Sequence, residues 1–366
     1  MFHTIAFIGL GLIGGSIARK VKELHPETCI MAYTRTRSTL EDAKADGTID
    51  IILDGIDETL SRCDLILLCT PVSYNAGYLQ AIRPFLKSGC ILSDVGSTKT
   101  EIHQQVIALG LEKSFIGGHP MAGSERTGYA CSRANLLENA YYVITPTAKS
   151  SQADIDRMVA FASELTAIPL VLNYRQHDYS VAAISHVPHL IAAGLVNLVA
   201  DSDSKDGVMK RIAAGGFKDI TRIASSSPVM WEQICMTNRE NIVSLMEDYI
   251  RSLQQMVSDL KQENGQAIFD CFERSGAYRS SISERGGATM NPEFSLFCDI
   301  PDKAGSISVL ASLLAYEGIS IKNIGINHNR EHLAGTIKIE FHDSASCEQA
   351  LQCLEYHHYP VYRKQP

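Results

Sequence analysis

A histidine in a turn of small residues is the side chain in this sequence best suited to proton transfer. His119 follows Gly117 and Gly118 and precedes Pro120. Imidazole titrates near neutral pH, and the glycines let backbone and ligand approach it closely. Such a ring can accept the proton of a substrate hydroxyl as a general base. The competing interpretation, for one of 12 histidines, is a solvated loop side chain.

A glycine-rich turn near the start predicts a dinucleotide site. The apolar residues 5–8 precede a G-x-G-x-x-G pattern, and apolar residues at helical spacing follow it. Glycines between a strand and a helix let the backbone approach a pyrophosphate at the helix N-terminus. The residues expected to contact the dinucleotide are Gly9, Gly11, Leu12, Ile13 and Gly14. With His119 as base, this pattern indicates a nicotinamide-dependent dehydrogenase.

The end of the second expected strand, residues 30–33, bears on which dinucleotide binds. NAD enzymes usually place an acid there, ~20 residues past the glycines, to hold the ribose hydroxyls. Here Thr34 takes that position and Arg35 and Arg37 follow. Positive charge suits the 2′-phosphate of NADP, so NADP is favoured over NAD. The alternative is that the arginines are solvated and that NAD binds through its pyrophosphate.

Two further apolar strands end in small polar residues. Thr70 and Pro71 follow residues 65–69, and Ser97 follows residues 90–95. Ligands of parallel sheets lie at the carboxyl ends of the strands, so these three residues are candidates to face the nicotinamide. Ordinary turns at strand ends would use the same residue types.

Long helical periodicity replaces short strands after about residue 170. Ser185 and His189 are four apart on one face of an apolar helix, which Pro188 should kink. Arg222 follows a diglycine and suits bidentate capture of a carboxylate, although an exposed arginine paired with Asp219 is an alternative. The single tryptophan, Trp231, begins a long amphipathic stretch that predicts a helix packed on a partner subunit.

A short module with strand and helix patterns closes the chain. Residues 277–292, rich in Ser, Gly and Arg, are expected to be a linker. The order βαββαβ after it predicts a small ferredoxin-like fold. The fold class expected overall has three parts: an α/β Rossmann-type dinucleotide-binding domain over residues 1–168, an all-α helical substrate and dimerisation domain over 169–280, and a small α+β ferredoxin-like domain over 293–366.

Composition excludes several other classes. A net charge of -8 over 366 residues argues against nucleic-acid binding. The 10 cysteines are scattered without metal spacing, so neither a metal site nor a disulfide framework is expected. The first residues lack a signal peptide, and no apolar run is seen that reaches the ~20 residues of a membrane span. A cytoplasmic enzyme is therefore expected.

The chain resembles, over essentially its full length, the prephenate dehydrogenases of tyrosine biosynthesis that carry a C-terminal ACT domain. The motifs that carry the resemblance are GLGLIGGS at residues 9–16, DVGSTK at 94–99, GGHPMAG at 117–123, SHVPH at 185–189 and GGFKDITR at 215–222. It implies that hydride leaves the carbinol carbon of prephenate for NAD(P), that a base takes the hydroxyl proton, and that loss of CO₂ makes the ring aromatic. Arogenate, the transaminated relative of prephenate, is the alternative substrate, and His189 beside Ser185 favours prephenate.

The resemblance also implies individual roles. His119 matches the catalytic base, Ser97 the serine that orients it, and Arg222 the arginine that binds a substrate carboxylate. Residues that match the pocket lining, the pocket rim and the dimer interface are Ser185, His189, Glu125, Asp219 and Trp231. A homodimer is implied, and L-tyrosine is the expected effector at the C-terminal module. The residues expected at the effector site are Asp302, Gly305 and Asn323.

Two other functions compete with this interpretation. A catalytically silent nucleotide sensor would be favoured if His119 or Arg222 were absent, and both are present. A β-hydroxy acid dehydrogenase would use a lysine base in the helical half. Lys218 is the comparable candidate, but it belongs to one of the motifs that carry the resemblance.

Overall fold

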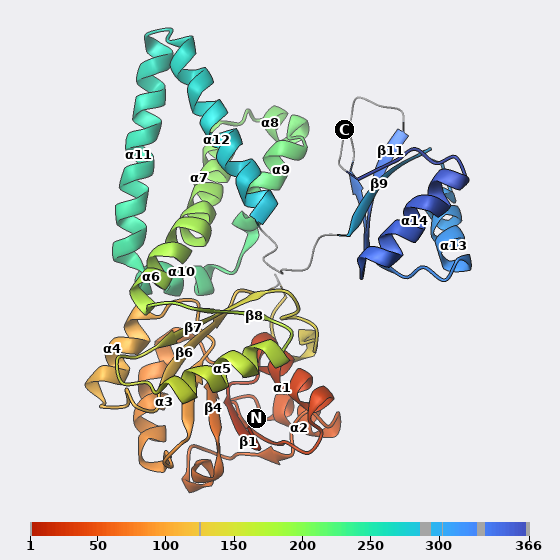
Figure 1. The fold of residues 1–366 in the computed structure, drawn as a ribbon. Coiled ribbons are helices and arrows are strands. Elements are labelled where there is room, and N and C mark those ends of the chain that lie inside the picture. The colour runs from red at the N-terminus through yellow and green to blue at the C-terminus, as the bar shows by residue number, and fades with distance from the viewer. Residues whose placement is uncertain (1, 124–125, 286–293, 302, 328–333, 364–366) are drawn as a thin grey trace. The chain divides into compact units, whose positions relative to one another are not determined.

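The computed structural model describes residues 2–123, 126–285, 294–301, 303–327 and 334–363. These residues divide into two compact units, Met1–Val257 and Ser258–Pro366, and the division falls inside one helix. Figure 1 labels the elements in chain order. The domain boundaries expected at residues 168, 280 and 293 stay predictions.

A five-stranded parallel sheet forms the base of the first unit. Its strands are β1 (Thr4–Ile8), β2 (Cys29–Tyr33), β3 (Ile51–Ile52), β4 (Leu65–Leu68) and β5 (Ile91–Asp94), in the order β3-β2-β1-β4-β5. Helices cover both faces (Figure 1). Alternation along β1 explains this, since Ile5 and Phe7 are buried in one core and Ala6 and Ile8 in the other. The sheet has the strand order of a Rossmann half, as predicted.

The helices divide between the two faces. On the face of Ile5 lie α1 (Leu12–Leu24), α2 (Arg37–Ala45) and α5 (Gln152–Glu164). On the opposite face lie α3 (Asn75–Ile82) and α4 (Thr100–Ala108). Short 3₁₀ turns occupy Glu58–Arg62, Val72–Tyr74, Arg83–Phe85, Tyr129–Cys131 and Arg222–Ser225.

A smaller sheet continues beside β5 and carries the expected base. It consists of β6 (Ile116–Pro120), β7 (Tyr141–Pro146) and β8 (Ile168–Val171). A bridge from Leu92 to Phe115 joins β6 to β5. Gly118 permits the close approach, because a Cβ there would lie 2.6 Å from the Asp94 carbonyl oxygen. His119 therefore lies near the carboxyl end of the parallel sheet.

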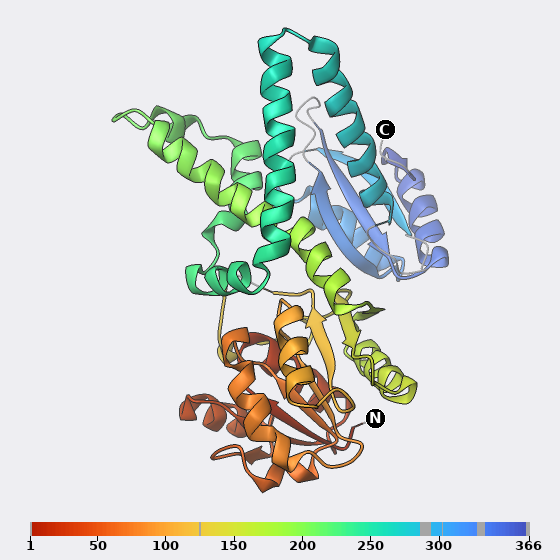
Figure 2. The same ribbon diagram turned by 90° about the vertical axis from the view of Figure 1, so that its left-hand side faces the viewer.

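The helical part of this unit begins with a helix that changes its winding. The helix α6 (Tyr174–Val181) passes through a π turn, Ala182–His186, into α7 (Val187–Ser202). Pro188, which lacks the N–H needed for a regular helical bond, explains why the helix widens just before it. The helices α8 (Val208–Ile212), α9 (Gly215–Thr221), α10 (Pro228–Thr237) and α11 (Arg239–Lys261) follow. Figure 2 shows α6 between the sheet and these helices.

The stretch from Trp231 to Leu260 is not the single helix that was predicted. Trp231 lies inside α10, and the chain leaves helical geometry at Asn238 before α11 begins. The Asn238 side chain explains the break, since its Nδ2 donates to the Asp178 carbonyl oxygen at 2.7 Å. A polar contact to a distant element thus interrupts an otherwise continuous amphipathic pattern.

The segment Tyr174–Ser202 is long and apolar enough, by length and composition alone, to cross a membrane. This differs from the expectation that the chain holds no such segment. The segment also carries His177 and Asp178, both fully buried against the nucleotide-binding half. Those polar contacts fit a helix packed within a globular unit.

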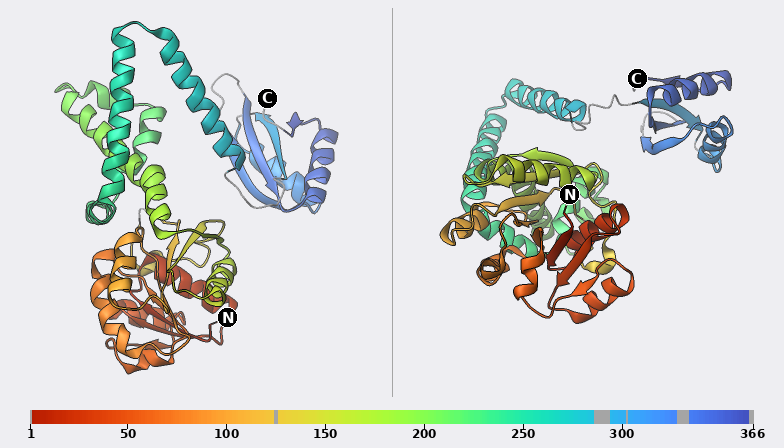
Figure 3. Two further views of the ribbon diagram at one scale, coloured as in Figure 1. Left: turned by 60° about the vertical axis from the view of Figure 1, so that its left-hand side comes forward. Right: turned by 60° about the horizontal axis from the view of Figure 1, so that its bottom comes forward.

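The second unit contains one long helix and a four-stranded sheet. The helix α12 (Gly265–Arg285) includes residues that the sequence pattern assigned to a linker, so that assignment is wrong for 277–285. The following elements are β9 (Ser295–Pro301), α13 (Ser306–Tyr316), β10 (Ile321–Asn327), β11 (Ala334–Phe341), α14 (Ser344–Tyr356) and β12 (Val361–Tyr362). Their order is βαββαβ, the sheet order is β10-β11-β9-β12, and both helices pack on one face (Figure 3).

Candidate active site

The glycine-rich turn forms an open cradle at the start of α1. Gly9 has φ +94° and donates its N–H to the Tyr33 carbonyl at 2.7 Å. A Cβ at Gly9 would lie 2.7 Å from the Cys69 carbonyl oxygen, and one at Gly14 would lie 2.9 Å from that of Gly9. Gly11 precedes the helix, no side chain caps it, and nothing lies within 4 Å of a Cβ placed there. The free N–H groups at this end, with Leu12 and Ile13 in the first turn, fit a pyrophosphate.

The two arginines after β2 differ in whether a carboxylate compensates their charge. Thr34 is half-buried at the strand end, where an acid was expected. The Arg37 guanidinium pairs with Asp54 at 2.6 Å and Glu41 at 3.5 Å, so its charge is largely neutralised. Arg35 is exposed and lies over the Tyr74 ring, 4.8 Å from its centroid. Of the two arginines, Arg35 is therefore the one whose charge is not compensated by a carboxylate. The prediction that both arginines favour a 2′-phosphate is thus limited to Arg35.

The other candidates for the nicotinamide side follow neighbouring strands. Thr70 and Pro71 come after β4, and the Thr70 hydroxyl donates to Asn75 Oδ1 at 3.1 Å. Ser97 lies half-buried in the loop after β5. All three are at the carboxyl edge of the sheet, where the glycine cradle also lies.

His119 is held by a chain of hydrogen bonds that leads into the helical part. Its Nδ1 is 2.8 Å from His177 Nε2, and His177 Nδ1 is 2.8 Å from Asp178 Oδ1. His177 and Asp178 have no exposed surface. Neither was singled out from the sequence, although adjacent titratable residues at the start of an apolar helix are an unusual pattern that could have marked them.

The role of Ser97 in orienting the His119 ring stays a prediction. Within the described part of the chain, the hydrogen bond of the His119 ring is made with His177. Ser97 makes no hydrogen bond to this ring there. Its side chain stays available to a bound ligand at the edge of the sheet.

A buried ion pair lies beside the base. The Lys99 ammonium contacts Asp94 Oδ2, and both side chains are fully buried. Asp94 also accepts the N–H of Gly96 at 2.9 Å and that of Gly118 at 3.2 Å. These bonds join the loop after β5 to the strand that carries His119, and they leave Lys99 compensated within the site.

The ring of His119 is neutral at physiological pH. Burial lowers its pKa well below the ordinary value, and the neighbouring side chains of His177, Lys99 and His186 lower it further. A neutral imidazole has a lone pair with which to accept a proton. The site therefore holds His119 in the protonation state that a general base requires.

The helices α7 and α10 form a wall in which a second histidine, His189, lies. His189 Nδ1 is 2.8 Å from the Ser185 carbonyl, so this nitrogen donates and Nε2 is left to accept. The ring stacks on Trp231 with centroids 3.8 Å apart. The Trp231 indole Nε1 is buried and has no partner among the described residues. Burial chiefly lowers the pKa of His189, and the charge of Arg222 contributes, which places that arginine in the same neighbourhood.

The remaining predicted residues are less informative. Asp219 is exposed on α9. Glu125 and Asp302 lie outside the described residues. Gly305 precedes α13 with φ +90°, and Asn323 Nδ2 donates to Glu340 Oε2 at 3.4 Å, both within the second unit. No group of three or more potential metal ligands is found among the residues that the structure describes.

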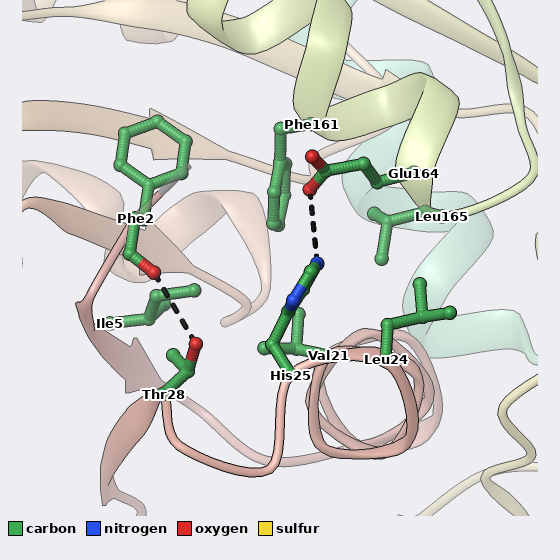
Figure 4. Close-up of a pocket in the computed structure, with 9 residues that line it drawn as sticks. All are labelled: Phe2, Ile5, Val21, Leu24, His25, Thr28, Phe161, Glu164 and Leu165. Atoms are coloured by element: carbon green, nitrogen blue, oxygen red, sulfur yellow. Dashed lines mark hydrogen bonds and ion pairs between the residues drawn. The ribbon is translucent and has the colours of Figure 1, made fainter.

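A small pocket lies at the other end of α1 and is unrelated to this site. Within it, His25 Nε2 lies 3.6 Å from Glu164 Oε2, and the two side chains face each other (Figure 4). The lining residues are Phe2, Ile5, Val21, Leu24, His25, Thr28, Phe161, Glu164 and Leu165. The 13 residues of α1 separate this pocket from the glycine cradle by about 20 Å. It is lined mainly by apolar side chains of the core.

Comparison with known proteins identifies the family. The family model for the prephenate dehydrogenase nucleotide-binding domain matches residues 17–168, and the one for the prephenate dehydrogenase dimerization domain matches residues 173–274. The prephenate dehydrogenase of Bacillus subtilis is 34% identical over 97% of this chain and 96% of its own length.

Solved structures give the same result. A prephenate dehydrogenase from A. aeolicus, in complex with hydroxyphenyl propionate and NAD+, has 26% identity and a TM-score of 0.72, covering 77% of this chain and 99% of its own. An arogenate dehydrogenase from Synechocystis has 27% identity and a TM-score of 0.69, covering 76% and 99%. With the glycine cradle, the half-buried base and the helical wall in one unit, these similarities show that the chain belongs to the prephenate dehydrogenase family of oxidoreductases.

Proposed function

We propose that this enzyme converts prephenate to 4-hydroxyphenylpyruvate by oxidative decarboxylation, with a nicotinamide dinucleotide as hydride acceptor. The observation that carries the proposal is His119, neutral and hydrogen-bonded, at the same edge of the sheet as the open glycine cradle. Membership in the family supports the reaction class. The similarity to an arogenate dehydrogenase keeps arogenate as the second candidate substrate.

The residues of the chain divide the work of the reaction. Gly9, Gly11 and Gly14 would hold the dinucleotide, which supplies the hydride acceptor when bound. His119 takes the proton of the ring hydroxyl at its free nitrogen, a contribution of about 10²–10⁴-fold. Arg222 binds a carboxylate of the substrate. Loss of CO₂ from the ring carboxylate then makes the ring aromatic, and this drives the reaction forward.

We propose that the wall made by α7 and α10 selects the substrate. His189 Nε2 and the unpartnered Trp231 Nε1 are an acceptor and a donor side by side, with Ser185 on the same helix. A donor on this wall suits the side-chain carboxylate, which prephenate and arogenate both carry, and His189 beside Ser185 is the feature that favours prephenate. The rim residues Glu125 and Asp219 complete the proposed pocket.

NADP is the dinucleotide that we propose, with NAD as the alternative. Thr34 has no carboxylate to repel a 2′-phosphate, and exposed Arg35 offers an unpaired guanidinium beside it. The A. aeolicus relative was solved with NAD+ bound, which shows the dinucleotide that binds to that enzyme. Arg37 is excluded from this role by its pairs with Asp54 and Glu41.

A homodimer is the proposed assembly. The helical part exposes many large apolar side chains, among them Ile184, Leu198, Ile212, Ile220, Val229, Met236, Val243, Ile250 and Leu253. Monomers rarely leave so much apolar surface uncovered. The family model that matches this region is that of a dimerization domain. A second copy of the chain is therefore the proposed cover.

The C-terminal sheet is proposed as an ACT domain that binds L-tyrosine. Its βαββαβ order supports the fold, and Gly305 opens α13 with no side-chain cap, so free N–H groups suit an amino-acid carboxylate. Asp302 and Asn323 are the other proposed contacts. A purely structural module is the alternative. Ten unpaired cysteines are consistent with the cytoplasmic location that we propose.

The test is an absorbance assay of nicotinamide reduction with purified protein. Prephenate and arogenate are each combined with NAD and with NADP, and prephenate with NADP should give the highest kcat/KM. His119→Asn should lower kcat by ~10²-fold or more and leave dinucleotide affinity unchanged. His25→Asn, at the far end of α1, is the matched control and should retain full activity. An unchanged rate in His119→Asn would remove His119 from the mechanism.

A further inference from the structure

We infer that Asp178 and His177 are positioning residues that fix the tautomer of His119, so that Nε2 carries the lone pair that accepts the substrate proton. The inference rests on the proposed function for the identity of that proton. Its structural part concerns only which nitrogen of His119 holds hydrogen.

The chain of bonds starts from a carboxylate that can only accept. Asp178 Oδ1 accepts the backbone N–H of Lys99 at 2.8 Å, and Oδ2 accepts that of Thr100 at 2.7 Å. Burial opposes ionisation of Asp178, but hydrogen bonds from His177 and Thr100 outweigh it and lower its pKa. Asp178 is therefore ionised, and His177 Nδ1, 2.8 Å from Oδ1, must be the donor.

The positions of the ring hydrogens on His177 and His119 follow if each ring carries one N–H. With hydrogen on Nδ1, the His177 ring offers a lone pair on Nε2. His119 Nδ1 lies 2.8 Å from that lone pair, so it must donate. Neutral His119 then has its own lone pair on Nε2. In the opposite tautomer two lone pairs would face each other at 2.8 Å inside a buried site.

The charges around the ring support the same assignment. Lys99, at the start of α4, is compensated by Asp94 of β5, to which its ammonium is bonded. His186, in the π turn, receives a hydrogen bond from Asn238 Nδ2 at 3.1 Å on its Nδ1. Each of these groups already has its partner. Asp178, through His177, is thus left as the negative charge that stabilises His119 when the ring becomes an imidazolium.

Three elements hold the orienting carboxylate in place. Asp178 belongs to α6, its side chain caps the first residues of α4, and its carbonyl accepts from Asn238, between α10 and α11. A rigid acceptor gives His177 one orientation. This is the arrangement expected of a residue that positions a base and does not itself touch the substrate.

The test compares two replacements of His177. Gln places an amide near the position of imidazole Nε2, and its carbonyl oxygen can accept from His119 Nδ1, whereas Leu cannot. We expect His177→Leu to lower kcat by about 10²-fold or more with unchanged KM for the dinucleotide, and His177→Gln to recover at least about tenfold of that loss. Equal kcat values for the two variants, or full activity in His177→Leu, would overturn the inference.

A spectroscopic measurement keeps the inference independent of turnover. Long-range proton–nitrogen correlation spectra of protein labelled with ¹⁵N-histidine report which ring nitrogen carries hydrogen. At pH 8 the His119 signals, assigned by their loss in His119→Asn, should be those of the Nδ1–H form and should remain so in His177→Gln. An Nε2–H signal for His119 in the wild type would refute the tautomer. Failure of the wild type to oxidise either substrate would refute the proposed function alone.

Discussion

Charge at single residues determines what each side of the site binds. On the substrate side, burial lowers the pKa of His189, and the positive charge of the nearby Arg222 lowers it further. On the dinucleotide side, Arg35 and Arg37 differ only in their partners. Substitution of Arg222 tests substrate binding, and substitution of Arg35 tests dinucleotide binding, each apart from the proton transfer at His119.

Replacement of the carboxylate-binding arginine should weaken substrate binding more than catalysis. A charge-assisted contact is worth about 1.5–3 kcal/mol and is present before the transition state, so Arg222→Ala should raise KM roughly 10- to 100-fold with little change in kcat. Steady-state kinetics with varied prephenate measure this. Lys218→Ala, on the neighbouring α9, is the control. A KM effect in the lysine variant alone would transfer the role to Lys218.

The cofactor preference should respond to one arginine and not the other. Arg35→Ala should lower the ratio of kcat/KM for NADP over NAD by about tenfold, the usual effect of one charge-assisted bond. Arg37→Ala should leave the ratio unchanged, because Asp54 and Glu41 already compensate that side chain. A wild-type ratio well below one that neither variant moves would show that the arginines do not read the phosphate.

At the scale of elements, the sequence predicted the strands and turns that are determined by residues close together in the chain. The Rossmann strands, the glycine turn and His119 were found because apolar runs and glycines fix them within a few residues. Asn238 and the relay of His177 and Asp178 were missed, because their roles come from hydrogen bonds to elements that are far away in sequence. A π turn, Ala182–His186, lies just before Pro188, where a kink was expected.

Two buried histidines make the stability of the fold depend on pH. His103 of α4 bonds Thr145 at 3.0 Å and stacks on Tyr174, and His186 lies in the π turn. Burial lowers the pKa of each to about 4. The unfolded chain takes up these protons near the ordinary value of about 6.5. Between the two values the unfolded state binds more protons, so stability is lost as pH falls through this window.

Urea denaturation at pH 7.5, 6 and 5 should therefore show a falling free energy of unfolding, by roughly 2 kcal/mol for each histidine between pH 7.5 and pH 5. His103→Phe retains an aromatic ring against Tyr174 but does not titrate. It should be less stable at neutral pH because the bond to Thr145 is lost, and its stability should depend less on pH. The same pH dependence in this variant would exclude His103 as a source.

At the scale of the whole chain, regulation and assembly belong to different segments. The proposed dimer surface lies in the helical part, and the proposed tyrosine site lies after residue 293. A chain ending at residue 292 should keep the mass of a dimer and its basal activity, and tyrosine should no longer inhibit it. Light scattering and inhibition assays measure the two effects. Asn323→Ala in the full chain is the companion variant, and undiminished inhibition of both proteins would move the tyrosine site to the active site.

Asp178 has a consequence for motion between the two halves of the first unit. The base is carried by β6 of the nucleotide-binding half, but the partner that orients it belongs to α6, and the same carboxylate joins α6 to α4. Any opening that pulls α6 away from α4 would also release His119 from its orienting bond. His119 is therefore oriented for proton transfer only while the contact between α6 and α4 holds the two halves together.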